Sequence, residues 1–454
     1  MKKLLQLTKA NLVMLLNAGS LVGTTVVTSV LGFAYWWSAA QLFPPAAVGL
    51  AAAAISAMML LGTVCMLGLG TLLTGELPRQ PGKERSLISA ALIVVGGVGT
   101  CLGTLFAATA PFVSTDLQPL RASGQNVALF ALGVGLTAIT LVLDQALIGL
   151  LRGGVQLWRN TLFAVAKLAA LLVAGLWLLH ETGMTIYATW LVGNALSLVA
   201  LIGFMRSKQG EVRKSYLPQW GLLRKLRAAA LQHHVLNLIL LAPPLVLPIV
   251  VTIQLSSTMN AWFYISFMLA NFVFGLTYAL STVLYALCSA RPDTLALKAR
   301  LTLTLATVTS ILASGVLLFG SKQVLGLFGH TYAEQAAWCL RFLSLAVFPL
   351  IVKSHYIAIC RIHDRLVHAM LPIAFGTLLE VGAAALGAFL GGLSGLSLGW
   401  LAALCVEAMF MSPTVYKAVR SLGALHDRDG LERYITYDES TNVTDTHANE
   451  PSFG

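Results

Sequence analysis

Residues 141–168 of this chain read LVLDQALIGLLRGGVQLWRNTLFAVAKL, two apolar runs joined by a polar segment from Arg152 to Arg159. Each run contains one mid-run charge, because Asp144 lies eight residues before Arg152 and Lys167 lies eight residues after Arg159. In helices both charges would lie about 12 Å from the turn, near the middle of a bilayer core roughly 30 Å thick. Ionisable groups at that depth usually face each other or a cavity. The hairpin is therefore a candidate functional site, or Asp144 and Lys167 form a buried ion pair that only pins two antiparallel helices.

The composition places the chain among membrane proteins. Hydrophobic residues make up 57% of its 454 residues, charged residues make up 10%, and the mean hydropathy is +0.81, whereas soluble domains carry about 25% charged residues. The formal charge of +11 does not indicate nucleic-acid binding, because the basic residues lie in short segments between apolar runs. The six cysteines lie in apolar runs without a CxxC pair, so we expect no disulfide framework and no metal site.

The apolar runs predict an all-α polytopic membrane protein with about twelve transmembrane helices. The expected spans are residues 12–38, 46–74, 86–110, 124–151, 158–180, 185–205, 231–255, 260–288, 300–320, 336–360, 366–391 and 395–418. The first apolar run is too long for a signal peptide and another span follows it at once, so we expect an uncleaved first helix.

Lysine and arginine predict the orientation of these spans. All but five of the 29 lie in segments that share one side of the membrane with the N-terminus. Only Arg121 and Lys322 lie in segments on the other side. Because short cytoplasmic segments are rich in lysine and arginine, we expect both termini to be cytoplasmic.

The longest internal break divides the spans six and six. It gives an N-terminal lobe (1–206), a cytoplasmic amphipathic linker (207–230), a C-terminal lobe (231–420) and a disordered acidic cytoplasmic tail (421–454). The linker combines leucine and tryptophan with basic residues, as interfacial helices do, whereas the tail is polar without a periodic apolar face. An even number of spans in each lobe predicts two six-helix lobes related by a pseudo-two-fold axis along the membrane normal.

The two halves repeat weakly in sequence. With an offset of 209 residues, Arg152 falls on Arg361 and Asp144 falls on Lys353. The repeat therefore predicts a charge in the second half at the depth of the charge in the opening hairpin.

Two stretches carry a resemblance to a known family. They are Gln41-Leu-Phe-Pro-Pro-Ala-Ala-Val-Gly49, with the glycine-rich span that follows and ends GLGTLLTGELPR, and the run from Asp144 to Asn160. With twelve spans and almost no extramembrane domain, the chain resembles bacterial O-antigen and polysaccharide flippases of the multidrug/oligosaccharidyl-lipid/polysaccharide (MOP) exporter superfamily.

The resemblance implies a function in lipopolysaccharide and surface polysaccharide biosynthesis. The protein would move undecaprenyl-diphosphate-linked oligosaccharide units from the inner to the outer leaflet of the bacterial inner membrane by alternating access. Its partners would be this lipid-linked oligosaccharide, membrane lipid, and a polysaccharide polymerase and chain-length proteins. No cofactor is implied.

Ten residues are candidates for the site. Four cations would line the substrate cavity and attract the diphosphate: Lys167, Lys353, Arg152 and Arg361. Three acids could couple an ion gradient: Asp144, Glu380 and Glu407. Three prolines in span seven indicate either a bent, gate-forming helix or a static kink, because each frees a backbone carbonyl: Pro243, Pro244 and Pro248.

Two other functions remain open at the level of sequence. A cation- or proton-coupled multidrug antiporter of the same superfamily is disfavoured by the absence of an acid in the first span and by two lysines at mid-depth. A membrane glycan polymerase is disfavoured by the absence of a large outside loop. The sequence also contains no Walker A loop and no HExxH motif, so we expect no enzymatic activity on this chain.

Overall fold

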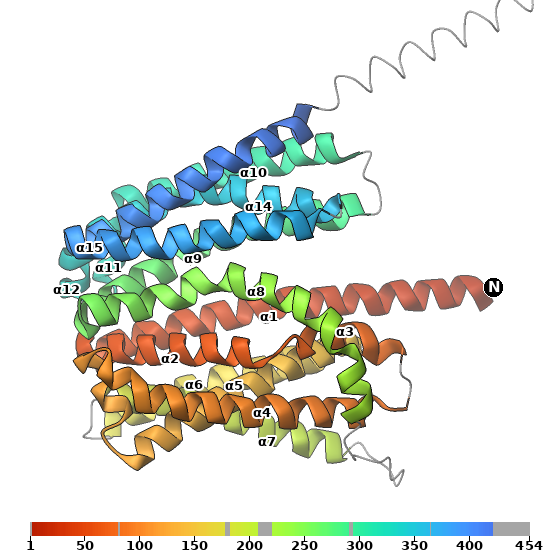
Figure 1. The fold of residues 1–454 in the computed structure, drawn as a ribbon, viewed down its shortest axis with the longest axis horizontal. Helices are drawn as coiled ribbons and strands as arrows, with labels where there is room; N and C mark the ends of the chain where they lie inside the picture. Colours follow the sequence, from red (N-terminus) through yellow and green to blue (C-terminus); the bar gives the residue numbers. More distant parts are fainter. Residues whose placement is uncertain are drawn as a thin grey trace, which may run out of the picture. The chain divides into compact units, whose positions relative to one another are not determined.

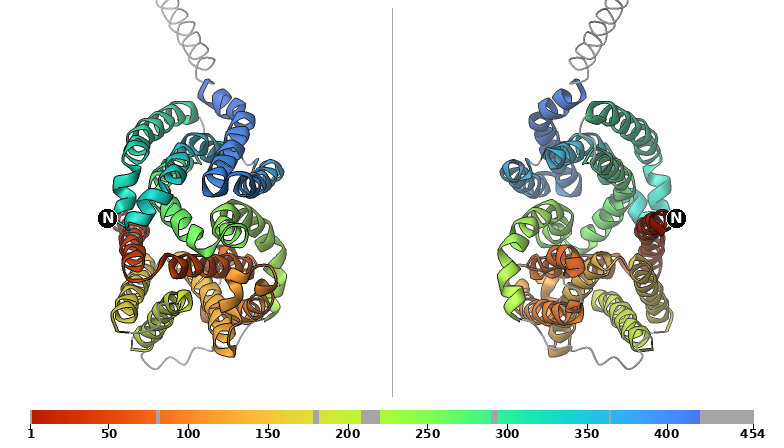
Figure 2. Two further views of the ribbon diagram at one scale, coloured as in Figure 1. Left: turned by 90° about the vertical axis from the view of Figure 1, so that its left-hand side faces the viewer. Right: turned by 90° about the vertical axis from the view of Figure 1, so that its right-hand side faces the viewer.

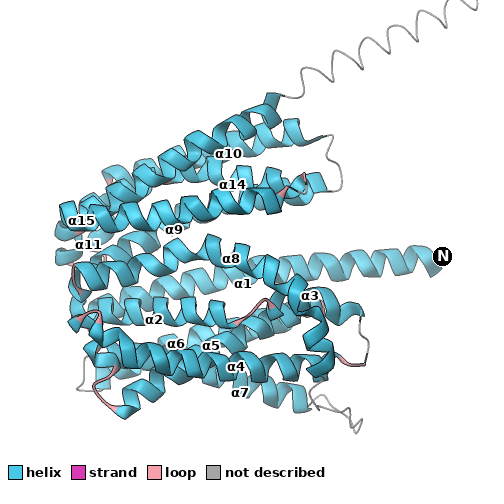
Figure 3. Cartoon of the chain, in the orientation of Figure 1, coloured by secondary structure: helices cyan, strands magenta, loops and turns pink. Residues whose placement is uncertain are grey.

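The computed structural model describes residues 2–79, 82–177, 182–207, 220–289, 294–363 and 365–420. These residues form helices joined by short turns, and none of them lies in a strand (Figure 3). The helices are labelled in Figure 1: α1 (Lys2–Leu42), α2 (Pro45–Cys65), α3 (Leu69–Glu76), α4 (Glu84–Thr109), α5 (Gly124–Gly149), α6 (Gly153–Trp177), α7 (Gly183–Ser207), α8 (Trp220–Gln254), α9 (Ser257–Ser289), α10 (Leu295–Phe319), α11 (Ser321–Gly326), α12 (His330–Gln335), α13 (Ala337–Leu345), α14 (Val347–Ile362) and α15 (Leu366–Arg420). Three 3-10 helices lie between them: η1 (Leu77–Arg79), η2 (Ala110–Phe112) and η3 (Thr115–Leu120).

Eleven helical stretches of the described chain are long and apolar enough to cross a membrane. The last of them, Val367–Arg420, has 54 residues and would be about 80 Å long if straight, more than twice the thickness of a bilayer core. Its backbone leaves the helical conformation at Gly391 and Gly392, where φ is −143° and 58°. The stretch therefore supplies two spans, and the predicted all-α fold with twelve transmembrane helices is confirmed.

Helix α15 folds back on itself through close glycine contacts. A Cβ atom on Gly387 would collide with the carbonyl oxygen of Gly395, and one on Gly399 would collide with the carbonyl oxygen of Ala383. Small residues let two membrane helices approach until their backbones touch. Glycines at the contact between the two arms of the hairpin thus allow the arms to pack closely.

The second predicted span is interrupted between α2 and α3. Leu67 and Gly68 have φ values of 49° and 74°, in the left-handed region that a bulky residue such as leucine rarely adopts. The break leaves the carbonyl of Val64 at the end of α2, and the Nε2 atom of His234 on α8 lies 3.2 Å from that oxygen. Because a carbonyl only accepts, the imidazole donates this hydrogen bond and satisfies the end of the helix.

The turn between α5 and α6 is shorter than the sequence predicts. Helix α6 begins at Gly153, so the prediction that residues 152–159 form a polar turn is wrong. The glycines and arginines of residues 152–159 suggested a turn. Near the end of a membrane helix, however, polar side chains can reach water, so such a segment can be helical. The turn is closed by the N–H of Arg152, which donates to the carbonyl of Leu147 at 2.8 Å, and Leu151 adopts φ 54°.

The chain divides into two compact units. Unit 1 contains Met1–Ala270, Leu317–Leu343 and Pro372–Ala403, and unit 2 contains Asn271–Val316, Ser344–Leu371 and Leu404–Gly454. In unit 1, α4 packs along α5, α1 along α6, and α6 along α7 (Figures 1 and 2). A buried core in unit 2 contains Leu284, Cys288, Leu295, Ala299, Ala358, Ile359 and Val415.

The predictions on the two lobes, the linker and the tail remain predictions. The division into lobes at 1–206 and 231–420, with its pseudo-two-fold axis, stays a prediction. Of the linker, residues 208–219 lie outside the described residues, and the helical backbone of α8 begins at Trp220. The tail at 421–454 also lies outside them.

Candidate functional site

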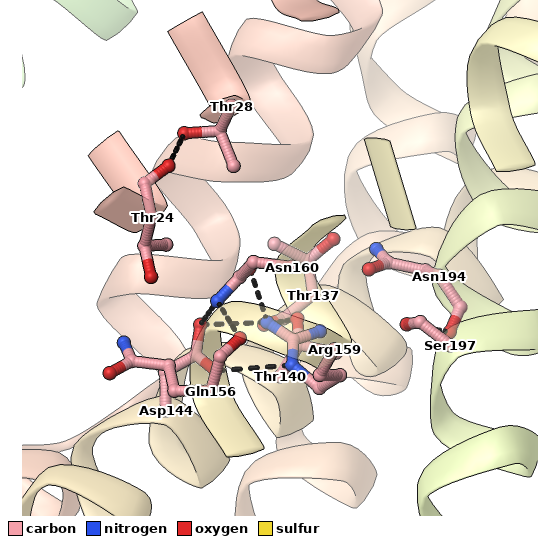
Figure 4. Close-up of polar contacts among 10 residues, drawn as sticks. All are labelled: Thr24, Thr28, Thr137, Thr140, Asp144, Gln156, Arg159, Asn160, Asn194 and Ser197. Atoms are coloured by element: carbon pink, nitrogen blue, oxygen red, sulfur yellow. Dashed lines mark hydrogen bonds and ion pairs between the residues drawn. The ribbon is translucent and has the colours of Figure 1, made fainter. Parts of the chain in front are cut away.

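A bidentate ion pair joins α5 and α6. The guanidinium of Arg159 donates from Nη2 to Oδ2 of Asp144 at 2.7 Å and from Nε to Oδ1 at 3.1 Å. Asn160 completes the group (Figure 4), since its Oδ1 accepts from Nη2 of Arg159 at 2.7 Å and its Nδ2 donates to Asp144 at 3.3 Å. The side chain of Arg159 is 3% exposed and that of Asp144 is 20% exposed. Paired forks of this kind are the strong form of a charged hydrogen bond, so this pair links α5 firmly to α6.

The predicted pair of Asp144 and Lys167 is wrong. The prediction measured depth from Arg159 as the end of the turn, but α6 starts at Gly153 and Arg159 already lies in the helix. Arg159 therefore stands level with Asp144, about 8 Å from the end of α5, and Lys167 lies about 12 Å further along α6. The long guanidinium side chain reaches the carboxylate across the helix pair, which leaves no role for Lys167 there.

The group around Asp144 has unused hydrogen-bonding capacity. Nη1 of Arg159, Oε1 of Gln156 and Oγ1 of Thr137 are buried and have no hydrogen-bond partner among the described residues. Figure 4 shows these side chains gathered from α5 and α6 around the ion pair. Buried polar atoms are almost always satisfied in folded proteins. The group could therefore also bond to water or to a polar ligand group within unit 1.

Lys167 lies instead in an aromatic enclosure that we call the ring box, formed by Tyr35, Phe163 and Trp190. Its Nζ atom lies 3.6 Å from the ring centroid of Trp190, 4.8 Å from that of Phe163 and 4.9 Å from that of Tyr35. Lys167 is 5% exposed, and among the described residues no carboxylate lies within ion-pair distance of it. The ring faces are thus its stabilising partners.

The packing around the ring box is tight. Tyr35 is fully buried on α1, and its hydroxyl donates to the carbonyl of Ile186 on α7 at 3.0 Å. Gly193 of α7 lies against α6, where a Cβ atom would be 2.8 Å from the Cβ atom of Lys167. The position therefore requires glycine, and the box joins α1, α6 and α7. Sequence reasoning missed the box because its rings come from three helices with no common spacing.

In unit 2, Lys353 and Glu407 form an ion pair between α14 and the last part of α15. Nζ of Lys353 lies 2.8 Å from Oε2 of Glu407, and their side chains are 10% and 4% exposed. The sequence placed Lys353 in the substrate cavity and Glu407 among the ion-coupling acids, as separate groups. Because the structure brings them together, each neutralises the other in this conformation.

The third predicted acid, Glu380, lies in the α15 hairpin of unit 1. It is 2% exposed, and its Oε2 atom accepts a hydrogen bond of 2.7 Å from the indole of Trp400. The ring of Trp400 in turn packs edge-on against Phe267 of α9, with 5.6 Å between centroids. Glu380 therefore links the two arms of the hairpin.

The two predicted arginines of the inner mouth lie at helix ends. Arg152 is exposed at the α5–α6 turn in unit 1, and Arg361 is half-buried near the end of α14 in unit 2. Neither forms an ion pair among the described residues. Within the described part of the chain, neither guanidinium group is neutralised by a carboxylate.

The prolines of span seven lie within α8, which stays helical from Trp220 to Gln254. Pro243 has no N–H to donate to the carbonyl of Ile239 one turn earlier. The hydroxyl of Thr377 on α15 donates to that carbonyl at 3.1 Å. A neighbouring helix thus satisfies the freed group, as expected in a membrane. Whether Pro243, Pro244 and Pro248 form a gate stays a prediction.

A set of contacts in unit 1 lies at the ends that the sequence predicts to face outward. Trp37 and Gln41 at the end of α1 both donate to the carbonyl of Leu327, each at 2.9 Å. The amide of Asn260 on α9 donates to the carbonyl of Gly49 on α2 at 2.8 Å. We call these bonds the outer closure. Sequence reasoning missed it because its acceptors are backbone carbonyls, which leave no trace in residue type.

One more contact belongs to the same end of unit 1. The carboxylate of Asp116 in η3 accepts from the N–H of Ser257, the first residue of α9, at 3.1 Å. An acid at a helix start satisfies a free N–H and interacts favourably with the helix dipole. Among the described residues, histidine, cysteine, aspartate and glutamate form no group of three that could hold a metal ion.

Apolar helices with buried ion pairs between some of them define a polytopic helical membrane fold. No protein-family model matches the sequence, and no curated protein sequence matches it. Solved structures do match, and by them the chain has the fold of the MOP superfamily exporters, which confirms the predicted resemblance at the level of fold.

Three of these structures cover nearly the whole chain. An inward-facing multidrug resistance MATE family transporter of the MOP superfamily superposes with a TM-score of 0.67 at 14% identity, over 89% of this chain and 99% of that one. The lipid II flippase MurJ, in an inward closed conformation, gives 0.63 at 11% identity over 88% and 87%. A MOP superfamily transporter from Pyrococcus furiosus gives 0.56 at 16% identity over 89% and 96%.

Proposed function

We propose that the protein is a flippase for lipid-linked oligosaccharides of surface polysaccharide synthesis. In this proposal it moves units carried on undecaprenyl diphosphate from the inner to the outer leaflet of a bacterial inner membrane by alternating access. The fold it shares with a lipid II flippase supports transport of a lipid-linked substrate. Both termini are cytoplasmic in this proposal, and a polysaccharide polymerase and chain-length proteins act on the product.

The proposal rests on one observation: among the charged side chains predicted to line the transport path, those without an ion-pair or hydrogen-bond partner among the described residues are positive. The three acids inside the spans already have partners, since Asp144 binds Arg159, Glu380 binds Trp400 and Glu407 binds Lys353. Of the four predicted cavity cations, Arg152 and Arg361 form no ion pair among the described residues, and Lys167 is enclosed by rings. A transport path whose free charges are positive suits an anionic substrate and disfavours a cationic one.

We propose two separate positions that could each bind the diphosphate, Arg152 in unit 1 and Arg361 in unit 2. Both lie at helix ends on the predicted cytoplasmic side, where the substrate enters, and both can form forked hydrogen bonds with phosphate oxygens. Lys353 is engaged by Glu407, and Lys167 is enclosed by rings, so neither is placed at the entrance. We propose no direct contact of Asp144, Glu380 or Glu407 with the substrate, because each already has a partner within the chain. Their predicted role in coupling to an ion gradient stays a prediction.

The second candidate is a cation- or proton-coupled multidrug antiporter, and one matching structure is named a multidrug resistance MATE family transporter. The ring box favours it, because three aromatic faces are a common way to bind an organic cation. However, the ammonium group of Lys167 itself occupies that place. A drug cation would have to compete with a tethered charge.

Reconstitution of the full chain in proteoliposomes separates the two functions. A fluorescent oligosaccharide on undecaprenyl diphosphate should become accessible to a lectin on the opposite leaflet, whereas efflux of an ethidium-type cation should stay at the rate of empty vesicles. Arg152→Ala and Arg361→Ala should each slow flipping by about tenfold or more, because a charged hydrogen bond contributes about 1.5–3 kcal/mol.

The control is Arg79→Ala, which removes an exposed arginine that already pairs with Glu76. It should leave flipping unchanged. Cation efflux without glycolipid flipping would overturn the proposal in favour of the antiporter. Equal flipping by all three variants would remove the assigned role of Arg152 and Arg361.

A further inference from the structure

Lys167 is a buried cation that the transport path described above does not use. Its Nζ atom lies within 5 Å of three ring centroids, and the shortest distance is 3.6 Å to Trp190. The ammonium group thus lies over the faces of three aromatic rings. The rings occupy the space in which an anion would lie, so the ring box does not bind the diphosphate in this conformation.

The rings stabilise the charge only in part. A desolvated cation–π contact contributes about 2 kcal/mol or more, whereas removing an ammonium ion from water costs several kcal/mol. Without a carboxylate, the rings offset only part of the cost of burying the charge, so small movements of the rings change how strongly Lys167 holds its proton. Lysine is suited to this because it loses its proton readily when buried, unlike arginine.

The ring box is connected to the outer closure through α1. Tyr35 supplies one ring, and Trp37 and Gln41 follow on the same helix within about 9 Å. These two side chains donate to the carbonyl of Leu327. A movement of Tyr35 away from α6 and α7 therefore also moves the donors of the outer closure.

We propose that Lys167 is the proton-binding site that couples transport to a proton gradient. Protonated Lys167 holds α1 against α6 and α7 and keeps the outer closure formed. When an N–H bond of the ammonium breaks, the proton passes to water, the neutral amine loses its attraction to the rings, and α1 is released. This inference rests on the proposed transport function and names its coupling ion.

No other acid or base competes at this position among the described residues. From α1 the ring box receives the phenol of Tyr35, and α7 contributes the phenol of Tyr187 nearby, which donates to the carbonyl of Phe130. On α6 the next charge is Arg159, two turns away and paired with Asp144 of α5. A proton exchanged here therefore belongs to Lys167.

Trp190 reports the proton directly, because an ammonium group above an indole changes its fluorescence. Emission of the purified full chain is recorded from about pH 5 to about pH 9, a range in which exposed lysines stay charged. The signal of Trp190 is the difference between the wild type and Trp190→Phe. We expect a step in this signal that Lys167→Met and Lys167→Arg both abolish.

Two further variants make the result specific. Phe163→Leu keeps Lys167 but removes one ring, which weakens the charged form, so the step should move to lower pH. Lys298→Arg makes the same exchange at an exposed lysine that donates to the carbonyl of Leu287, and its step should match the wild type. A step that survives in Lys167→Met, or that Phe163→Leu does not shift, would overturn the proposal.

Transport gives an independent readout. In proteoliposomes, a pH gradient should accelerate glycolipid flipping by the wild type, and Lys167→Arg should lose this acceleration, because arginine keeps its proton. An unchanged response in Lys167→Arg would also overturn the proposal. The fluorescence step needs no substrate, so a step without flipping would contradict the proposed function and leave the proton site standing.

Discussion

Helix α6 carries two buried cations that are stabilised in different ways. Arg159 uses its planar fork to bind both oxygens of Asp144, and its neighbour Asn160 bonds to both partners. Lys167 has a compact ammonium group and binds ring faces. The fork fixes geometry and keeps its proton, whereas the ammonium can lose its proton. The first arrangement therefore suits a permanent link between α5 and α6, and the second suits a group that changes state.

The link between α5 and α6 can be tested by a double-mutant cycle. Asp144→Leu or Arg159→Leu alone should lower stability by about 3–5 kcal/mol, because each leaves a buried charge without its partner. The double variant should recover most of that loss. Thermal unfolding of purified protein in detergent measures all three. Glu76→Ala, which breaks the exposed pair with Arg79, is the control and should cost less than about 1 kcal/mol.

A loss in the double variant equal to the sum of the two single losses would show that Asp144 and Arg159 act independently. If the double variant regains its abundance but does not flip glycolipid, the pair also has a role in transport. Its unused hydrogen-bonding atoms, Nη1 of Arg159 and Oε1 of Gln156, are where such a role would lie.

At the residue level, the sequence identified the charges but not their partners. Counting along the chain predicted that Asp144 and Lys167 lie within membrane spans, and both lie in helices long and apolar enough to cross a membrane. Which side chain of α6 faces Asp144 depends on the residue at which α6 starts and on the direction in which each side chain points. The eight residues from Arg159 to Lys167 turn the helix by about 80° beyond two full turns, so these two side chains point in different directions. The ring box was not predictable, because it depends on the packing of α1 and α7 against α6.

At the level of elements, glycine decides where α15 turns back. Gly392 has φ 58° and ψ −140°, a conformation that residues with a side chain avoid, and no atom lies within 4 Å of the position of a Cβ atom there. The requirement for glycine is therefore conformational and not steric. Gly382, in the same helix, also has open space around it but has ordinary helical geometry.

These two positions form a matched pair for mutation. Gly392→Ala should destabilise the protein by about 1–3 kcal/mol, because alanine is strained at this φ and ψ. Gly382→Ala should be neutral or stabilise it by up to about 1 kcal/mol, because alanine favours the helix. Thermal unfolding in detergent measures both. Similar effects at the two sites would show that the turn at Gly392 tolerates side chains.

Most elements were predictable because hydrophobic length is a strong signal in membrane proteins. The breaks inside the elements were not. Span two is interrupted at Leu67, an apolar residue in a left-handed conformation that composition does not reveal. The end of α2 is satisfied by His234, which lies far along the chain on α8. Interruptions that depend on a distant partner leave no local pattern.

At the scale of the whole molecule, the predicted topology assigns the arginines and the outer closure to opposite faces of the membrane. Arg152 and Arg361 lie at helix ends in segments predicted to be cytoplasmic. The outer closure joins the segments around Gln41, Asn260 and Leu327, at ends predicted to face outward. A flippase that is closed on the outside and open to substrate on the inside needs this orientation, so the proposed function depends on the sidedness of the chain.

The sidedness can be tested with reporter fusions. Alkaline phosphatase, active only outside the cytoplasm, should be inactive when fused after Gly454 and active when fused after Gly392, where the chain turns between its last two spans. A fluorescent protein that matures only in the cytoplasm should give the opposite result at both sites. The physical reason is the retention of lysine and arginine on the cytoplasmic side, where all but five of the 29 are expected. Active phosphatase after Gly454 would reverse the topology, place Arg152 and Arg361 outside, and remove the diphosphate entry site from the side where its substrate is made.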